Sequence, residues 1–311
     1  MPERPWDTSA PAKVILLGEH AVVYGQPAIS LAVDLRMRCR VRPDAASSLN
    51  GTPLTPHNYS YVSACLDKLG SGPMAVTTEA DFPSGSGLGS SAAVTVSLLA
   101  ALAARKGGWR ESDVARQAFE VESDIQGRAS PIDTSTSAHG RGIFVKKERN
   151  EGLLWEISRD SRRWYVHDLN VPQMRLVIGF TGRSAPTGPL VAKVKRYVDR
   201  TRFASDIIEE IGQVTEEGAE RLARNDMESL GRLMTRDHKL LAILGVSSPE
   251  LDKLVSAALP YSYGAKLTGA GGGGSMVALT DDPLKVAEAI KKKGGQPFIA
   301  STGVAGVREE L

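Results

Sequence analysis

The chain has 311 residues, of which 41% are hydrophobic and 24% are charged, a composition typical of a globular protein of about two domains. Its 38 basic and 36 acidic residues give a net charge of +2, which is too even to favour a nucleic acid or a membrane surface as partner. Two cysteines exclude a disulfide framework, and the longest apolar run is shorter than the ~20 residues of a bilayer span. The first residues show no signal-peptide pattern, so we expect a cytoplasmic protein.

The first half of the chain predicts a mixture of strands and helices. Alternation over 35–42 predicts a half-buried strand whose basic face carries Arg36, Arg38, Arg40 and Arg42. This face is either an anion-binding or nucleic-acid surface or a solvated face or protected edge of a sheet, and the even net charge favours the second interpretation. The other patterns predict strands at 14–17, 28–33, 74–80, 142–146 and 153–157, and helices at 61–69, 111–125 and from residue 90 to Gly107.

The second half predicts a separate domain. Residues 164–172 cross the expected boundary between domains 1–170 and 171–311. A mostly helical region, 190–245, is expected to break at Asn225 and Asp226, and Ser248 before Pro249 predicts a helix start. Strands are expected at 175–180, 275–280 and 296–302, and helices at 249–259 and 283–293. Because strands and helices alternate without regular βαβ order, we expect an α+β fold.

Glycine is concentrated in two segments, 83–91 and 264–274. In the first, glycines at 85, 87 and 89 free the backbone, and serines at 90 and 91 open a helix. The unpaired amides and the dipole of that helix favour a phosphate group, although a plain loop and helix cap would leave the same pattern. It is neither a Walker A loop nor a dinucleotide fingerprint. The second segment matches G-x-G-x-x-G, but a strand follows it, so we expect a backbone that packs beside a bound nucleotide or an inert turn.

Three blocks carry a resemblance to the GHMP superfamily of small-molecule kinases. They are PAKVILLGEHAVVYG from residue 11, PSGSGLGSSAA from residue 83 and KLTGAGGGG from residue 266, in that family's order and spacing. GEHAVVYG is most similar to the members that act on mevalonate. The resemblance implies a ribosomal-protein-S5-like N-terminal domain, a ferredoxin-like C-terminal domain and a homodimer. It also implies ATP-dependent phosphorylation of the primary hydroxyl of mevalonate, in isoprenoid biosynthesis. A related kinase for another alcohol or phosphorylated substrate, and a non-catalytic ligand sensor, are the alternatives.

The same resemblance implies roles for individual residues. Asp133 is similar to the catalytic aspartate, which accepts or orients the hydroxyl proton, and Lys13 to the lysine that stabilises the transferring phosphoryl group. Mg²⁺ would be held by Ser91 and Glu122, although Glu120 and Asp124 are close in sequence. The ATP phosphates would lie on Pro83, Gly85, Ser86, Gly87, Leu88, Gly89, Ser90 and Ser91. Substrate contacts would come from Glu19, from His20 as a hydrogen-bond donor, and from Thr181 and Gly271.

The sequence departs from the family pattern at two places, of which the first should leave the reach of Lys13 intact and the second puts local packing, but not Asp133, in doubt. Ala12 replaces a glycine beside Lys13, and the sequence SAHG at 137–140 replaces a more typical Ser-Thr-Phe-Gly. The remaining histidines match no motif and are expected to be ordinary surface or core residues: His57, His139, His167 and His238.

Overall fold

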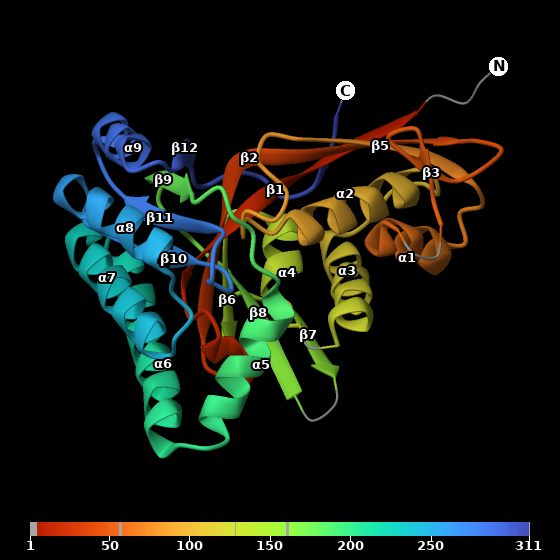
Figure 1. The fold of residues 1–311 in the computed structure, drawn as a ribbon. Coiled ribbons are helices and arrows are strands. Elements are labelled where there is room, and N and C mark those ends of the chain that lie inside the picture. The colour runs from red at the N-terminus through yellow and green to blue at the C-terminus, as the bar shows by residue number, and fades with distance from the viewer. Residues whose placement is uncertain (1–4, 56–57, 128, 160–161, 311) are drawn as a thin grey trace.

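The computed structural model describes residues 5–55, 58–127, 129–159 and 162–310, and it confirms the α+β fold (Figure 1). The N-terminal half contains the strands β1 (Trp6–Leu17), β2 (Ala28–Pro43), β3 (Ser48–Leu49), β4 (Thr52–Pro53), β5 (Met74–Ala80), β6 (Gly142–Lys146), β7 (Leu153–Arg159) and β8 (Arg162–Leu169). Its helices are a 3₁₀ turn (Ala21–Tyr24), α1 (Ser60–Leu69), α2 (Ser90–Ala104), α3 (Glu111–Gln126) and α4 (Ile132–His139).

The C-terminal half begins with β9 (Arg175–Phe180). The helices α5 (Thr187–Val198), α6 (Arg202–Ala223), α7 (Met227–Ile243), α8 (Pro249–Ala258) and a 3₁₀ turn (Leu259–Tyr261) follow it. The chain ends with β10 (Gly264–Thr268), β11 (Ser275–Leu279), α9 (Pro283–Lys292), β12 (Gln296–Ser301) and β13 (Arg308–Glu309). Within the described ranges, no helix combines the length and apolar character that crossing a bilayer requires.

Two sheets organise these elements. The larger has the order β4-β3-β5-β2-β6-β8-β7, and β1 pairs with both β2 and β13. Helices α2 and α4 pack on β1 and β2, and α1 and α3 pack beside α2. The smaller sheet has the order β10-β11-β9-β12 and carries α7, α8 and α9, as Figure 1 shows for the blue and cyan part of the chain.

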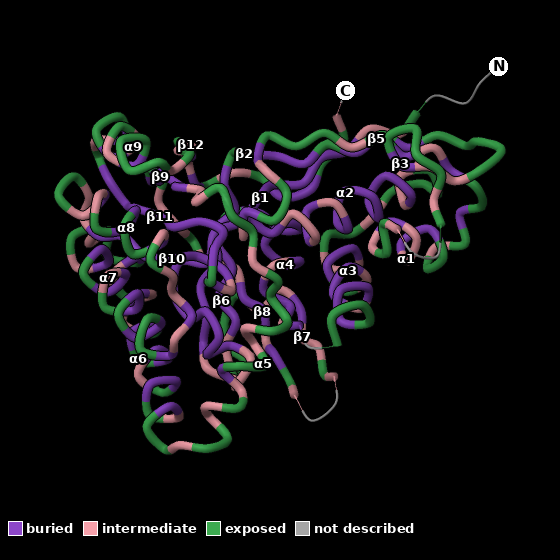
Figure 2. Tube along the Cα trace, viewed as in Figure 1, coloured by how far each residue is buried: buried purple, intermediate pink, exposed green. Residues whose placement is uncertain are grey.

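Strands β1 and β2 contribute side chains to two hydrophobic cores, one on each face. Along β1, Val14 and Leu16 belong to the core that includes the C-terminal helices, whereas Ile15 belongs to the core under α2 and α3. This follows from the alternation of side chains along a strand. Figure 2 shows the buried chain in purple running through the middle of the molecule, where β1 and β2 lie.

The two strands predicted at 28–33 and 35–42 are one strand, β2. Its first part is buried on both faces, and beyond residue 36 the basic residues Arg38, Arg40 and Arg42 are exposed while the residues between them are buried. The solvated-face interpretation is therefore correct for these three residues and wrong for Arg36, whose side chain is buried. The edge interpretation is wrong, because β2 pairs with β1, β5 and β6. The three exposed guanidinium groups lie beside carboxylates of Asp81, Asp7 and Asp44.

Several elements differ from the sequence predictions. Strand β1 begins at Trp6 rather than at residue 14, since polar residues such as Thr8 are buried there, with the hydroxyl of Thr8 donating to the carbonyl of Ser97 at 2.7 Å. Helix α4 was not predicted, because its hydroxyl side chains are typical of turns. The region 190–245 has a second break, between α5 and α6, and the first glycine-rich residues from Gly264 form β10.

Candidate active site

The first glycine segment forms the predicted loop before a helix. Gly85, Gly87 and Gly89 have φ values of 71°, 83° and 76°, which side chains other than glycine's adopt only at a cost. Gly89 is the residue before α2 and carries no side chain that could cap it, so the first amides of α2 stay open for an anion.

The second glycine segment packs on the first, backbone against backbone. A Cβ atom at Gly269 would lie 3.2 Å from the carbonyl oxygen of Gly87, and one at Gly274 would lie 3.2 Å from that of Ser86. A Cβ atom at Gly271 would lie 2.0 Å from the carbonyl oxygen of Val246, so a side chain is excluded there as well. The missing side chains therefore allow the C-terminal half to approach the first segment, residues 83–91, directly; we call this segment the phosphate loop.

Lys13 and Asp133 meet at the base of this loop. Lys13 comes from β1 and Asp133 from the first turn of α4, and the Lys13 Nζ lies 3.1 Å from the Asp133 Oδ2. The lysine side chain is 3% exposed and the aspartate 24%, so the carboxylate is the more accessible member of the pair. The Lys13 Nζ also donates to the carbonyl of Gly87 at 3.4 Å.

Glu122, on α3, is buried beside this pair. Burial raises the pKa of its carboxyl group to about 8; the negative charge of Asp133 acts in the same direction, and Lys13 acts against it. Gln126 donates to Glu122 at 3.0 Å. The two acidic residues nearest to Glu122 in the sequence face different partners, because Glu120 pairs with Lys68 and Asp124 with Arg159.

A cavity of about 440 Å³ brings most of the predicted residues together. Its wall includes Lys13, Glu19, His20, Gly85, Gly87, Gly89, Ser90, Ser91, Glu122, Asp133 and Gly271. The structure does not bring Thr181 to this wall. Its hydroxyl group instead donates to the carbonyl of Gly274 at 2.9 Å and so holds the second glycine segment from behind. Pro83, Ser86 and Leu88 belong to the loop without lining the cavity.

His20 has an unusual backbone conformation, with a φ of 60°. Such strain is typical of functional positions. Its Nε2 lies 2.9 Å from the carbonyl oxygen of Ala270, which can only accept, so Nε2 carries the proton. Burial lowers the pKa of the ring. The neutral ring therefore has Nδ1 left as an acceptor, whereas the sequence predicted a donor.

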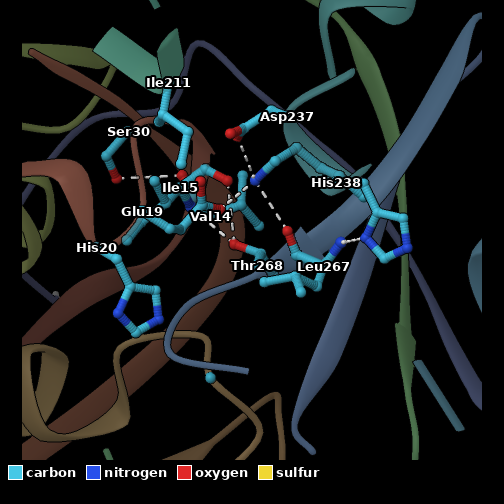
Figure 3. A network of polar contacts seen from close by, with 12 residues as sticks. Val14, Ile15, Glu19, His20, Ser30, Ile211, Asp237, His238, Leu267 and Thr268 are labelled. Carbon is cyan, nitrogen blue, oxygen red and sulfur yellow. Dashed lines mark hydrogen bonds and ion pairs between the residues drawn. The ribbon is translucent and has the colours of Figure 1, made fainter. Parts of the chain in front are cut away.

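Sequence reasoning missed a buried charge cluster behind Glu19 (Figure 3). Lys266, on β10, forms ion pairs with Glu19 and with Asp237 of α7, the latter at 3.3 Å, and the three side chains are 0–1% exposed. The Lys266 Nζ also donates to the carbonyl of Leu267 at 2.9 Å. A signal for Asp237 existed in the sequence, since it shares the buried face of a helix with Leu233 and Leu241 at a spacing of four residues.

Three of the remaining histidines are buried and have polar partners away from the cavity. His139 Nδ1 lies 3.2 Å from Glu111, His167 accepts from the amide of Asn150, and His238 accepts from the amide of Leu267. His57 lies outside the described residues.

Comparisons with known proteins agree with this geometry. Residues 58–141 match the N-terminal domain of the GHMP kinases, and residues 219–296 match their C-terminal domain. The fold and the phosphate loop thus define a small-molecule kinase of the GHMP type.

Individual relatives narrow the class. The chain is 35% identical to a mevalonate kinase of Pyrococcus furiosus, over 97% of each chain. It is 36% identical to one of Methanothermobacter thermautotrophicus, over 87% of this chain and 88% of the relative. The crystal structure of the Methanococcus jannaschii mevalonate kinase superposes with a TM-score of 0.79 at 26% identity, covering 96% of this chain and 98% of the other. The chain belongs to the mevalonate kinase family of the GHMP kinases.

Proposed function

We propose that the protein transfers the terminal phosphoryl group of ATP to the 5-hydroxyl group of mevalonate, giving 5-phosphomevalonate and ADP for isoprenoid biosynthesis. The observation that carries this proposal is the Lys13–Asp133 pair, 3.1 Å apart, at the base of a glycine loop that opens a helix. The relatives named above are mevalonate kinases, and this chain matches them along most of their length. This similarity supports mevalonate as the alcohol.

The two charged side chains have distinct tasks. Asp133 is the more exposed and faces the cavity, so its carboxylate accepts or orients the proton of the substrate hydroxyl group. Lys13 is held between Asp133 and the carbonyl of Gly87, a position from which its charge stabilises the negative charge that develops on the phosphoryl oxygens. The hydroxyl oxygen attacks the phosphorus, the bond to the ADP oxygen breaks, and the hydroxyl proton leaves toward Asp133.

The residues present fit a magnesium ion. Ser91 and Glu122 line the same cavity, and burial raises the pKa of the Glu122 carboxyl group, whose charged form a bound cation would favour. Among the described residues no three side chains form a cage that could hold a metal, and a hydroxyl group with one carboxylate suits Mg²⁺, which keeps water and phosphate oxygens as its other ligands. When bound, the ion neutralises the oxygens of the β- and γ-phosphates.

The nucleoside has room beside the phosphate loop. A second cavity, of about 640 Å³, shares Tyr61, Ser91 and Gln126 with the first, and Thr187 and Val191 of α5 line both cavities. We place the adenosine of ATP there, since its phosphates then reach the start of α2. The homodimer, the cytoplasmic location and the 1–170 and 171–311 domains remain predictions.

Asp133→Asn tests the mechanism. The amide keeps the shape of the side chain but cannot accept the proton, so we expect kcat to fall by about 10²–10⁴-fold while nucleotide binding persists. ADP release coupled to NADH oxidation measures turnover with mevalonate, and homoserine, galactose and phosphomevalonate serve as alternative substrates. Turnover of the variant near that of the unaltered protein would contradict the assignment, and absence of any ADP from the unaltered protein with mevalonate would contradict the function.

A further inference from the structure

The cluster of Glu19, Lys266 and Asp237 contains more acidic groups than basic ones. Two carboxylates face one ammonium group, and all three side chains are 0–1% exposed. Burial raises the pKa of Glu19 to about 8, and the charge of Asp237 adds to this effect while that of Lys266 opposes it. Taking charges out of water costs several kcal/mol per ion, and well-packed apolar residues often serve stability as well or better. Stability alone therefore does not explain this cluster.

The cluster joins segments that are far apart in sequence. Glu19 follows β1, Asp237 lies on α7 and Lys266 lies on β10, as seen for the labelled Glu19 and Asp237 in Figure 3. Next to it, Thr268 also links these segments, because its hydroxyl group accepts from the amide of Ile15 at 2.9 Å. The cluster thus fixes the turn after β1 to the smaller sheet.

This turn forms one wall of the substrate cavity. Glu19 and His20 both line it, and the His20 ring is held by the carbonyl of Ala270, four residues after Lys266. Lys266 itself does not line the cavity and so does not reach the substrate. Its position directly behind Glu19 means that its effect on a ligand has to pass through the turn at residues 19–20.

We propose that Lys266 is a positioning residue for the alcohol substrate: its ammonium group holds Glu19, and with it His20, against the cavity from behind. Asp237 fixes Lys266 from the other side. The identity of the alcohol rests on the proposed function, whereas the positioning role rests on the contacts of Lys266.

Lys266→Met is the direct test, since methionine keeps much of the length of the side chain without the charge. With Glu19 and His20 released, we expect the KM for mevalonate to rise at least about tenfold, while the KM for ATP changes less than about threefold. The phosphate loop and Lys13 do not touch the cluster, which is why the two constants should separate.

A second variant covers the case in which Lys266→Met does not fold because it leaves two buried carboxyl groups without their cation. Lys266→Met combined with Asp237→Leu removes one charge of each sign and leaves Glu19 alone without its cation. The same rise in the KM for mevalonate is expected. Asp237→Asn, which keeps the pair between Lys266 and Glu19, should leave this KM within about threefold of the original value.

Leu267→Ala is the matched structural control. Leu267 is the next residue of β10 and is fully buried, so its truncation loosens the strand by about 2–5 kcal/mol without touching the charges. Below its melting temperature this variant should keep the original KM for mevalonate.

The outcomes separate the two proposals. Lack of turnover of mevalonate by the unaltered protein contradicts the proposed function alone, and the comparison is then made with the alcohol that is turned over. If the unaltered protein is active and the lysine variants show an unchanged KM for the alcohol, the positioning role is wrong. It is equally wrong if they alter both KM values to the same extent, or if Leu267→Ala reproduces their effect.

Discussion

At the scale of single residues, an absent side chain determines where the lysine of the active site lies. A Cβ atom at Gly89 would come within 2.9 Å of both Cγ and Cε of Lys13. Real Cβ atoms do not approach other carbons so closely, so the lysine would have to leave its place beside Asp133. We therefore expect Gly89 to matter for catalysis beyond its backbone conformation.

Gly89→Ala should reduce kcat by about tenfold or more, because displacement of Lys13 costs stabilisation of the transition state. Gly51→Ala is the control, since Gly51 has a φ of +80° against +76° at Gly89 but has no atom within 4 Å of the added methyl group. Both variants carry the same backbone strain. A kcat of Gly89→Ala equal to that of Gly51→Ala would contradict a role of the contact with Lys13.

At the scale of elements, the C-terminal strand supports the helix that carries Asp133. Strand β13 pairs with β1, and the amide of Val307 donates to the carbonyl of Ala138 at the end of α4. Arg36 holds this segment, since its buried guanidinium group donates to the carbonyls of Ala305 at 3.0 Å and Gly306 at 2.7 Å.

Arg36→Met should lower the free energy of unfolding by about 2–4 kcal/mol, because several buried carbonyl groups lose a charged donor. Arg40→Met on the same strand is the control. Its side chain is 62% exposed and pairs only with Asp7 among the described contacts, so a change below about 1 kcal/mol is expected. Urea unfolding followed by circular dichroism measures both, and similar losses would contradict the special role of Arg36.

The sequence predicted elements best where side-chain periodicity was simple. The strand at 74–80 and the helix at 111–125 were found from their apolar spacing, almost to the residue. Helix α4 was missed because its buried hydroxyl groups bond to its own backbone, as Thr136 does to the carbonyl of Ile132, which no apolar pattern reveals. The proposed catalytic pair, Lys13 and Asp133, came from family resemblance, whereas the Lys266 cluster depends on contacts across more than 200 residues and needed the structure.

At the scale of the whole molecule, the buried carboxyl groups couple stability to pH. The pKa of Glu19 is raised from 4.5 to about 8 in the folded protein, so between these values the folded state holds a proton that the unfolded state has lost. The contribution is therefore fully present below about pH 4.5 and is lost as the pH rises through 8.

We expect the free energy of unfolding to fall between pH 7 and 8.5, by up to about 1.4 kcal/mol per pH unit for this group. Glu19→Gln cannot lose the proton and should show a shallower slope. Burial lowers the pKa of His20, so His20 makes the free energy of unfolding rise with pH, but only below the ordinary histidine pKa of 6.5. The window from pH 7 to 8.5 lies above that range. Urea titrations at several pH values without Mg²⁺ measure the slope, and parallel slopes for the two proteins would refute the coupling.

The strands that serve both cores also limit how the protein can be recombined. Val14 and Ile15 of β1 face different cores, and the core on the side of Val14 also contains side chains of the C-terminal helices. A cut between the two halves of the chain therefore divides this core. A chimaera made by joining the N-terminal half of this chain to the C-terminal half of a relative would have to match the α6 and α7 side chains to one face of β1 and β2. The useful units for exchange are therefore these two strands together with the helices on both sides, rather than the two halves of the sequence.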